Sequence, residues 1–378
     1  MPADIRLVED AMGRADFIAL PKSLYRGHAG YVAHLDMERK DTLDRRRNPY
    51  FDHAQAALFV AYAHGRPVGR VSAQLCRLFQ EKHGEQIGHF GFLDAEDDPA
   101  LVRDLLDRAA QWLRERGARV MLGPFHFSIN EEIGLMVEGF MSRPMIMMPY
   151  HPPYLGAHVA AAGFEKAKDV LAYDLPTAAY RPMGGGRLLA RMGAESRLRV
   201  RSLQAHRMEE EVRAFFDIYN DAWSQNWGMI PFTDAEARAA TKALKPLIVP
   251  DLVRVAELDG VPVAMLLCLP NLNEAISDLG GRLLPFGWAK LLWRLKANRL
   301  QSARIALMGI RKKYQGTPAS SAMLALMFDS LVAPARARGF RHIELSWILE
   351  DNQPMRRVIE AIGGKPYKTF RLYERPLA

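Results

Sequence analysis

The chain of 378 residues contains very little cysteine, only Cys76 and Cys268. Two cysteines so far apart exclude a disulfide framework and a zinc site built from several thiolates, and they favour a reducing compartment such as the cytoplasm. The first residues lack a basic region followed by an apolar core, and no apolar run reaches the roughly 18 residues of a membrane span. We therefore expect neither export nor an integral membrane protein.

Negative charge is in the minority, with 43 Asp and Glu against 51 Lys and Arg, which gives a formal net charge of +8. This balance favours an acidic partner: the phosphates of coenzyme A, anionic lipid or nucleic acid. The sequence lacks a helix-turn-helix, zinc-finger or aromatic RNA-binding signature, so nucleic acid is the least favoured of the three. With 49% hydrophobic and 25% charged residues, the chain has the composition of about two globular domains.

Residues 305–326 combine three features that favour a bound phosphate. An apolar strand leads into Arg311, Lys312, Lys313 and Gly316, and an amphipathic helix begins at Pro318. Backbone N–H groups at a helix N-terminus and nearby cations both attract an anion. The absence of GK[ST] excludes a Walker loop, and the paucity of glycine excludes a dinucleotide fingerprint. A plain solvated basic bend is the alternative.

The predicted elements occur twice in the same order. Hairpins at 57–75 and 252–269 are each followed by a strand, a helix and a second strand. The stretch 176–195, with three consecutive glycines, is the predicted linker. We predict an α/β (α+β) fold of two tandem domains, residues 1–190 and 191–378, each a mixed, mostly antiparallel sheet flanked by helices.

The two predicted domains differ between strand and helix. The first has Leu93-Asp94-Ala95-Glu96-Asp97-Asp98-Pro99, with four carboxylates and no glycine. Such a loop would repel a pyrophosphate. We therefore expect the first domain to have lost cofactor binding and the second to keep it.

A polar segment after a predicted strand contains His126, Asn130, Glu131 and Glu132. Ligands often bind at the carboxyl ends of strands. His126 is a candidate general base oriented by Glu131 or Glu132, and one carboxylate could instead hold an amine substrate. The alternative is structural, with Asn130 capping a helix and the glutamates in its first turn.

Aromatic and amide side chains gather at the end of a predicted helix. Tyr219, Asn226 and Trp227 could line a narrow acceptor cleft. The helical spacing of Phe215, Phe216, Tyr219 and Trp223 instead favours a core stripe, and for Phe215, Phe216 and Trp223 we prefer the core.

Residues 285–300 form a predicted basic amphipathic helix with two tryptophans. Leu291, Leu292, Leu295 and Trp288 give it an apolar side, and cations flank them. This pattern is typical of a helix in a membrane interface, which would hold the protein peripherally at the inner face of the membrane. A helix packed on the sheet or one covering an acyl-chain tunnel are the alternatives.

The last part of the chain carries a family resemblance. A strand at 341–349 is followed by Asn352, a helix, Gly363-Gly364 and a closing strand. Together with the phosphate-binding segment predicted at 305–326, this order resembles the GCN5-related N-acetyltransferase (GNAT) superfamily. The acyl-CoA bend of that superfamily has the form Arg/Gln-x-x-Gly-x-Gly/Ala. Lys313 stands where Arg or Gln is usual, and Pro318 where a small residue is usual. The whole chain looks like a bacterial GNAT-like group that includes proposed bacterial ceramide synthases.

The resemblance implies an acyl-CoA-dependent N-acyltransferase, in which an amine attacks a thioester. Backbone N–H groups along 307–310 would stabilise the oxyanion, those along 315–319 would bind the pyrophosphate, and Asn352 would contact the pantetheine arm. The implied CoA contacts are Met308, Gly309, Ile310, Lys313, Tyr314, Gln315, Gly316, Thr317, Ala319 and Asn352. Candidate bases are Glu344 and Glu350, with His126 and Glu132 reaching across from the first domain. Candidate acceptor contacts are Asn130, Glu131, Tyr219, Asn226, Trp227 and Trp347, and we expect no metal.

One departure from the family pattern limits these expectations. The tyrosine that usually acts as the acid falls at Ile359, so Tyr367, Tyr373 or water would have to protonate the leaving thiolate. The favoured reaction moves a fatty acyl group to a sphingoid base. A non-catalytic acyl-CoA or lipid sensor is one alternative, and transfer to an amino acid or aminoacyl-tRNA is another.

Overall fold

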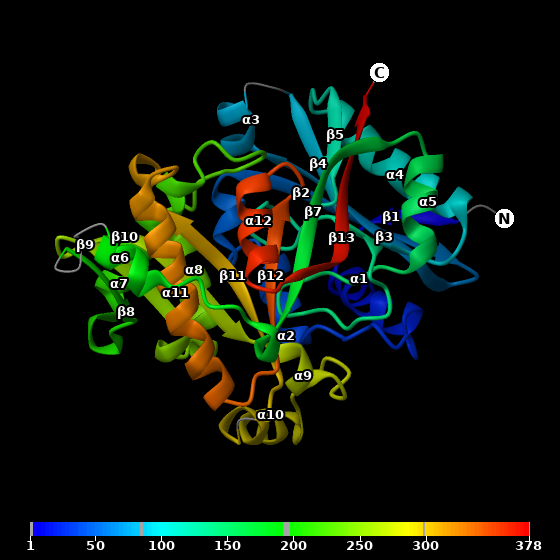
Figure 1. The fold of residues 1–378 in the computed structure, drawn as a ribbon. Helices are drawn as coiled ribbons and strands as arrows, with labels where there is room; N and C mark the ends of the chain where they lie inside the picture. The colour runs from blue at the N-terminus through cyan, green and yellow to red at the C-terminus, as the bar shows by residue number, and fades with distance from the viewer. Residues whose placement is uncertain (1–2, 84–85, 192–196, 298, 378) are drawn as a thin grey trace. The chain divides into compact units, whose positions relative to one another are not determined.

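The structure is a computed structural model that describes residues 3–83, 86–191, 197–297 and 299–377 (Figure 1). The chain divides into two compact units. Unit 1 comprises Met1–Leu171, Ile276–Trp288 and Lys368–Ala378, and unit 2 comprises Ala172–Ala275 and Ala289–Tyr367. The end of the chain thus packs with its N-terminal part, whereas residues 172–190 pack with the second unit. A single domain boundary near residue 190 stays a prediction from sequence.

Unit 1 is built on a mainly antiparallel sheet. Its strands are β1 (Asp4–Leu7), β2 (Ala54–Ala63), β3 (Arg66–Cys76), β4 (Ile87–Ala95) and β5 (Val120–Gly123), in that spatial order. The part of β13 (Lys365–Pro376) in this unit pairs antiparallel with β5 and with β6 (Leu135–Glu138). Strands β4 and β5 are parallel. The predicted hairpin is β2 and β3, which turn at His64 and Gly65, both with positive φ.

The helices of unit 1 are α1 (Ala11–Leu24), α2 (Asp36–Leu43), α3 (Arg77–His83), α4 (Pro99–Arg114) and α5 (Pro153–Ala161), with the 3₁₀ turn η1 (Pro49–Asp52). Helix α4 packs on β3 and β4 through apolar residues at helical spacing, Leu101, Leu105, Ala109 and Leu113, all of which are buried. Its cap is Asp98, whose carboxylate accepts the N–H groups of Ala100 and Leu101.

Unit 2 repeats this arrangement. Its strand order is β12 (His342–Leu349), β11 (Ser302–Ile310), β10 (Val261–Pro270), β9 (Val253–Leu258) and β8 (Leu198–Ser202), and the end of β7 (Glu165–Pro176) lies beside β12. The predicted hairpin is β9 and β10, and β11 and β12 are the parallel pair. Each unit therefore has a hairpin, a strand, a helix and a parallel strand in sequence order, as predicted.

The remaining helices are α6 (Gly185–Arg191), α7 (Met208–Ala222), α8 (Asp234–Leu244), α9 (Leu272–Ile276), α10 (Gly287–Lys296), α11 (Pro318–Ala337) and α12 (Gln353–Ala361). Short 3₁₀ turns occur at η2 (Thr177–Ala179), η3 (Ala205–Arg207), η4 (Lys245–Leu247), η5 (Pro250–Leu252) and η6 (Lys312–Tyr314). Helix α7 packs on β10 and β11, and α11 packs on β8 and β9.

Helix α11 is the core helix of unit 2. Nine of its residues are buried, among them Met323, Phe328 and Leu331. Within the described part of the chain it is also the one helix long and apolar enough to cross a membrane, and half (50%) of its apolar window is buried. Burial against the strands accounts for its apolar composition, because a helix that is apolar on most sides can be buried in a protein core.

The predicted linker is structured where the structure describes it; residues 192–196 lie outside the described residues. The carboxylate of Asp329 on α11 accepts hydrogen bonds from the Tyr180 hydroxyl and from the backbone N–H groups of Met183 and Gly185. These three bonds hold the chain before α6 against α11. Residues 176–191 are therefore ordered against unit 2, and their role as the linker between two domains stays a prediction.

Candidate functional site

The parallel strands β11 and β12 of unit 2 separate part-way along their length. Their pairing runs from Ser302 with His342 to Ile305 with Leu345 and is not continued in the described residues, although both strands go on. Ala306 forms a bulge at the same point, since Leu307 pairs with Leu267 and Ile305 with Cys268. Bulges redirect a strand and end its pairing. Residues 306–308 of β11 and 347–349 of β12 lie in the diverging parts of the two strands and are half-buried.

The divergence leads to the predicted phosphate bend. Strand β11 ends at Ile310, η6 carries two lysines, and Gly316 has a φ of 72°. Among the described residues, no atom lies within 4 Å of the position a Gly316 Cβ would take. The bend is thus both left-handed and open, which lets a ligand approach its backbone closely.

The side chains of the bend hold its shape. Gln315 donates from Nε2 to the carbonyl oxygens of Ala222 and Ile310, at 3.0 and 2.9 Å. Thr317 caps α11, accepts the Ser320 N–H and donates to the Tyr314 carbonyl. Gln315 and Thr317 are therefore positioning residues by their side chains, and the cap explains why the helix begins at Pro318.

The backbone donors of the bend are fewer than predicted. The N–H groups of Gln315 and Thr317 already donate to Lys312 and Tyr314 within the turn, and Pro318 has no N–H. Gly316 and Ala319 keep N–H groups for which the described residues provide no acceptor. The Lys312 N–H is also committed, to the carboxylate of Asp221 at 2.7 Å.

A buried ion pair joins β11 and β12 where the two strands are still paired. Arg304 Nε is 3.5 Å from Glu344 Oε1, and Ser346 Oγ donates to the same oxygen at 2.6 Å. The other oxygen accepts the hydroxyl of Tyr367. Burial and then the Glu344 charge raise the pKa of Tyr367, so its proton is held tightly. These bonds commit Glu344, predicted as a base, to a structural network.

Trp347 lies beside this pair. The Arg304 guanidinium is 4.8 Å from its ring centroid. Its indole Nε1 is buried and has no hydrogen-bond partner in the described part of the chain. A buried donor without an acceptor is costly, and an acceptor on a bound ligand would satisfy it. Of the residues predicted to contact the amine substrate, Trp347 is thus the one whose buried hydrogen-bond donor has no partner among the described residues.

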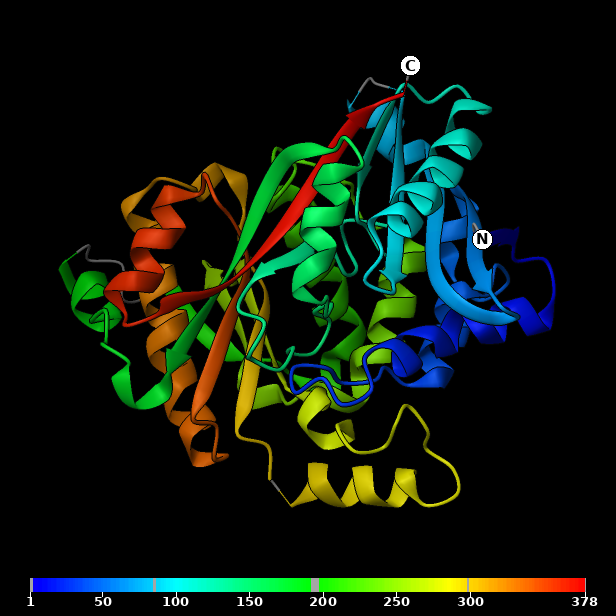
Figure 2. The same ribbon diagram turned by 90° about the vertical axis from the view of Figure 1, so that its right-hand side faces the viewer.

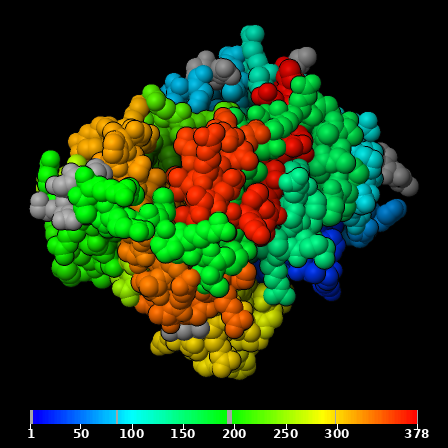
Figure 3. Space-filling view, in the orientation of Figure 1, coloured from blue at the N-terminus to red at the C-terminus, as the bar shows by residue number. Residues whose placement is uncertain are grey.

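The other predicted residues of β12 and α12 have local roles. Asn352 is the N-cap of α12 and accepts the Met355 N–H through Oδ1. Glu350 is half-buried in the preceding turn, and its carbonyl accepts Arg356 Nη1 at 2.7 Å. Ile359, at the position of the missing tyrosine, is fully buried. Figure 3 shows α12, in orange-red, at the surface of the molecule.

The aromatic stripe of α7 is core. Tyr219 is 6% exposed and packs with Ile218, Met229 and Met265, and its ring contacts Trp223 edge-to-face at 4.3 Å. A ring in this position does not line an open cleft, so the prediction of Tyr219 as a cleft wall is not supported by its position. Asn226 and Trp227 are half-buried in the turn after the helix.

Unit 1 brings together the two side chains that the sequence pairs. Phe125 and Ile133 form a bridge, and the His126 N–H donates to the Glu132 carbonyl at 2.8 Å. This narrow loop places His126 Nδ1 2.7 Å from Glu132 Oε2. The segment forms a loop and then β6, so the alternative of a helix capped by Asn130 is wrong. Asn130 and Glu131 lie in the turn of the loop, where their N–H groups bond Ser128.

Arg39 completes this cluster and was not predicted. Its Nη2 donates to both Glu132 oxygens, at 2.7 and 2.8 Å, and its side chain is buried with that of Glu132. Burial alone would raise the pKa of Glu132. The opposing effect of Arg39, His34 and His126 is larger, so the pKa lies well below its ordinary value. Glu132 is therefore an anion at neutral pH.

The electrostatics leave His126 neutral. Burial lowers its pKa, and Glu132 opposes this shift only in part. The bond to an anionic carboxylate assigns the proton to Nδ1, which makes Nε2 the basic nitrogen. Among the described residues, none is within hydrogen-bond distance of His126 Nε2. The ring stacks on Phe92 at 4.3 Å and 9°, which fixes its plane. A carboxylate-oriented neutral imidazole is a general base in outline.

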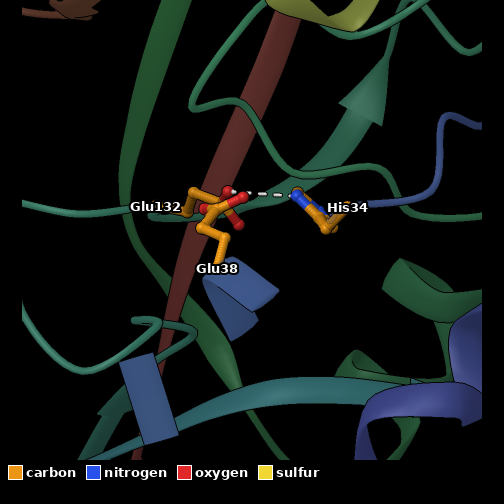
Figure 4. Close-up of side chains that lie close together, drawn as sticks. All are labelled: His34, Glu38 and Glu132. Carbon is orange, nitrogen blue, oxygen red and sulfur yellow. Dashed lines mark ion pairs between the residues drawn. The ribbon is translucent and has the colours of Figure 1, made fainter. Parts of the chain in front are cut away.

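His34, Glu38 and Glu132 also satisfy the geometry of a metal site. Their candidate ligand atoms lie within 4.8 Å of one another. Figure 4 shows the carboxylates of Glu132 and Glu38 together, with His34 facing them across the marked ion pair. However, Arg39 already occupies both Glu132 oxygens, and its charge opposes a second cation. The donor set therefore fits an ion-pair cluster better than a metal centre.

In unit 1 the backbone that follows β5 packs directly on β4. A Cβ on Gly91 would be 1.7 Å from the Phe125 carbonyl oxygen, because that backbone lies directly on β4. The sequence prediction placed Asp94 in a loop, but it belongs to β4 and is buried against Arg70 and Tyr25. Asp98 occupies the first N–H groups of α4. The first N–H groups of α4 are therefore already bonded, and the loss of cofactor binding in the first domain stays a prediction.

Comparison with known proteins identifies the family. No protein-family model matches the chain. It is 44% identical over 368 residues to a protein named "Bacterial ceramide synthase" from Caulobacter vibrioides, covering 96% of this chain and 94% of that protein. The chain belongs to the bacterial ceramide synthase family. Protein YghO of Escherichia coli is 39% identical over 361 residues, covering 96% and 92%.

Solved structures give the fold of this ceramide synthase family member. A tandem GNAT protein from the clavulanic acid biosynthesis pathway aligns with a TM-score of 0.58 at 12% identity, covering 100% of this chain and 99% of that one. A GCN5-related N-acetyltransferase from Sphaerobacter thermophilus aligns with a TM-score of 0.54 at 14% identity, covering 99% and 96%. The predicted fold of tandem GNAT domains is confirmed.

Sequence reasoning missed several residues that shape this family member's candidate site. Arg39 stands in a run of charged residues, and its only signal is its place between Leu35 and Leu43 at helical spacing. Asp221 and Asp329 bond backbone groups far along the chain, at Lys312 and Gly185. No sequence pattern reports such long-range contacts.

Proposed function

We propose that the chain is an acyl-CoA-dependent N-acyltransferase whose thioester binds to unit 2. The observation that carries the proposal is the separation of β11 from β12 beyond Ile305, which ends at the open bend around Gly316. A flexible pantetheine chain needs such a gap between strands, and a pyrophosphate needs the bend that follows. The tandem GNAT fold and the name of the Caulobacter relative support the same reaction class.

The residues of unit 2 fit the two ends of a CoA thioester. Arg311, Lys312 and Lys313 supply positive charge beside the N-terminus of α11. The N–H groups of Gly316 and Ala319 are the donors that we assign to the pyrophosphate. The backbone N–H group of Met308, which follows the bulge and is directed away from β10, is the candidate for the oxyanion. The thioester itself supplies the activated acyl group.

We assign the general base to His126 and its orientation to Glu132. The attacking amine must lose a proton, and a neutral imidazole with an unoccupied Nε2 can accept it. Glu344 is the weaker candidate, because Arg304, Ser346 and Tyr367 already use its two oxygens. The pKa of Tyr367 is raised, which makes this hydroxyl a poor acid for the leaving thiolate. We assign that proton to water.

The substrate is proposed by relationship. Because the Caulobacter relative is named a ceramide synthase at 44% identity over nearly its full length, we propose a long-chain acyl-CoA as donor and a sphingoid base as acceptor. The rival, a sensor that binds acyl-CoA without turnover, is prompted by Ile359 in place of the usual tyrosine.

The deciding experiment combines the purified chain with palmitoyl-CoA and sphinganine. We expect release of free CoA thiol, followed with a thiol reagent, and an N-acylated product of the corresponding mass. Omission of the amine should abolish both. Gly316→Glu should abolish thiol release while the protein stays folded. Acyl-CoA binding without thiol release across a panel of amines would favour the sensor, and absence of any CoA thioester binding would refute the proposal.

A further inference from the structure

Exposed apolar side chains of the described residues are concentrated in residues 282–297, which we call the basic apolar segment. The described part of the chain exposes ten large apolar side chains, and five of them belong to this segment. They are Leu284 and Phe286, each 79% exposed, and Trp288, Leu292 and Trp293, at 50%, 47% and 53%. Figure 2 shows the segment in yellow, as a loop that leads into α10.

Helix α10 exposes three of its large apolar side chains, Trp288, Leu292 and Trp293. Every residue of Gly287–Lys296 is described by the structure, and none is buried. Trp288, Leu292 and Lys296 follow each other at four-residue steps along the exposed side, with Trp293 next to Leu292. Leu291 and Leu295 lie on the half-buried side. A helix packed firmly on a sheet would bury part of its apolar stripe and would not leave both of its tryptophans exposed.

The charge of the segment is of one sign. It contains Arg282, Lys290, Arg294 and Lys296, and no Asp or Glu occurs anywhere from residue 279 to residue 328. Arg299 lies over the Trp293 ring at 4.4 Å, so a cation and an aromatic ring are presented together. Arg294 Nη1 donates to the Ala275 carbonyl at 2.6 Å and anchors the helix through its half-buried side.

We propose that the basic apolar segment docks onto the surface of an anionic phospholipid bilayer. The exposed apolar and aromatic side chains would enter the acyl boundary, and exposed cations such as Arg282 and Lys296 would meet the headgroups. Charge argues against the other occupant of an exposed apolar surface, a second copy of the chain. An isologous contact would bring the same cations face to face. This inference does not depend on the proposed acyltransferase activity.

The test is flotation of the full chain with vesicles of phosphatidylcholine alone or with added phosphatidylglycerol. We expect the wild type to float with the phosphatidylglycerol vesicles and to remain unbound with phosphatidylcholine alone. Trp288→Ser with Trp293→Ser, and separately Arg282→Glu with Lys296→Glu, should each weaken binding by about tenfold or more. Brominated lipid should quench the tryptophan fluorescence of the wild type and not that of the tryptophan pair variant.

Matched controls come from exposed residues elsewhere. Met141→Ser removes an apolar side chain that is 87% exposed, and Arg238→Glu with Lys242→Glu reverses two exposed charges on α8. Both should bind within about twofold of the wild type. Since all of these positions are exposed, circular dichroism should show every variant folded. Lack of binding to phosphatidylglycerol vesicles, equal loss in the controls, or a dimer that the tryptophan variant dissociates would overturn the proposal.

Discussion

His126 Nδ1 lies 2.7 Å from Glu132 Oε2, inside a cluster where Arg39 bonds both oxygens of the same carboxylate. The loop geometry alone brings the pair together, since the two residues face each other across one narrow hairpin loop. A carboxylate held as an anion by an arginine can fix an imidazole tautomer without taking its proton. The pair therefore has the properties of an oriented base.

His126→Gln should reduce the acyl-transfer rate by about 10²-fold or more, because glutamine cannot accept the amine proton. Acyl-CoA binding should be unchanged, since the proposed CoA contacts lie in unit 2. Steady-state kinetics with calorimetry of acyl-CoA binding would check both. His158→Gln is the control, because His158 also pairs with a carboxylate, Asp97, at 2.7 Å in unit 1 but at an exposed site. Equal loss in both variants would contradict the assignment.

The pH profile gives an independent check of the same base. Because the pKa of His126 is lowered, chiefly by burial, its basic form should persist below the ordinary histidine pKa of about 6.5. We expect the acid limb of the kcat/KM profile to fall below that pH. Glu132→Gln removes an interaction that raises this pKa, so the acid limb should move to still lower pH. Movement to higher pH would contradict the pairing.

Gly316→Glu should weaken CoA binding by about tenfold or more, because a carboxylate would meet the phosphates in the open bend. The control is Gly65→Glu in the β2–β3 turn. Gly65 has a φ of 77°, close to the 72° of Gly316, and open surroundings. The backbone strain is therefore matched, and only the location differs. Calorimetry should show the wild-type affinity for Gly65→Glu, and a similar loss in both would mean that strain alone is responsible.

Local patterns in the sequence were enough to predict most elements of both units. The hairpins, α4, α11 and α12 depend on alternation, helical periodicity and caps within a few residues, such as Asp98 and Asn352. The contact between His126 and Glu132 could also be predicted, because the two residues are close in sequence and follow a strand; their catalytic role stays a prediction.

What the sequence did not reveal depends on distant partners. The pairing of β13 with β5 joins the end of the chain to unit 1, and no local signal marks such a contact. Asp94 was placed in a repelling loop because its partner, Arg70, is on another strand. Arg39 was overlooked because its neighbours are charged as well. Charge alone cannot separate a buried ion pair from a solvated surface.

The Arg304–Glu344 pair predicts an asymmetric response to mutation. Arg304→Met should lower the free energy of unfolding by about 3–5 kcal/mol, because Glu344, which is 0% exposed, would keep a buried charge without its partner. Adding Glu344→Gln should restore much of the loss. Urea denaturation would measure both. Arg197→Met, which breaks the exposed pair with Asp259, should cost less than about 1 kcal/mol. Additive effects of the two buried substitutions would contradict the coupling.

His89 predicts a pH dependence of stability that owes nothing to function. Both ring nitrogens are buried without a hydrogen-bond partner in the described part of the chain, between Phe79 and Phe125 at 4.4 and 4.8 Å. Burial, with a smaller effect from His83, lowers the pKa of His89 to about 3. In the unfolded chain the pKa is about 6.5, so between these values the unfolded state binds the extra proton.

The sign follows directly, because a proton taken up only on unfolding favours the unfolded state. Stability should fall as the pH drops from about 6.5 towards 3, by about 2 kcal/mol at pH 5 from this group. His89→Leu removes the titrating ring and its two unsatisfied nitrogens. The unfolding of this variant should therefore take up as much as one proton fewer than that of the wild type, and its free energy of unfolding should change less with pH. Urea denaturation of both proteins at pH 7.5 and pH 5, about one unit above and 1.5 units below the ordinary pKa, measures the difference. If the two proteins lose the same stability over that interval, His89 is already charged in the folded chain, and the buried, unbonded ring described above is wrong.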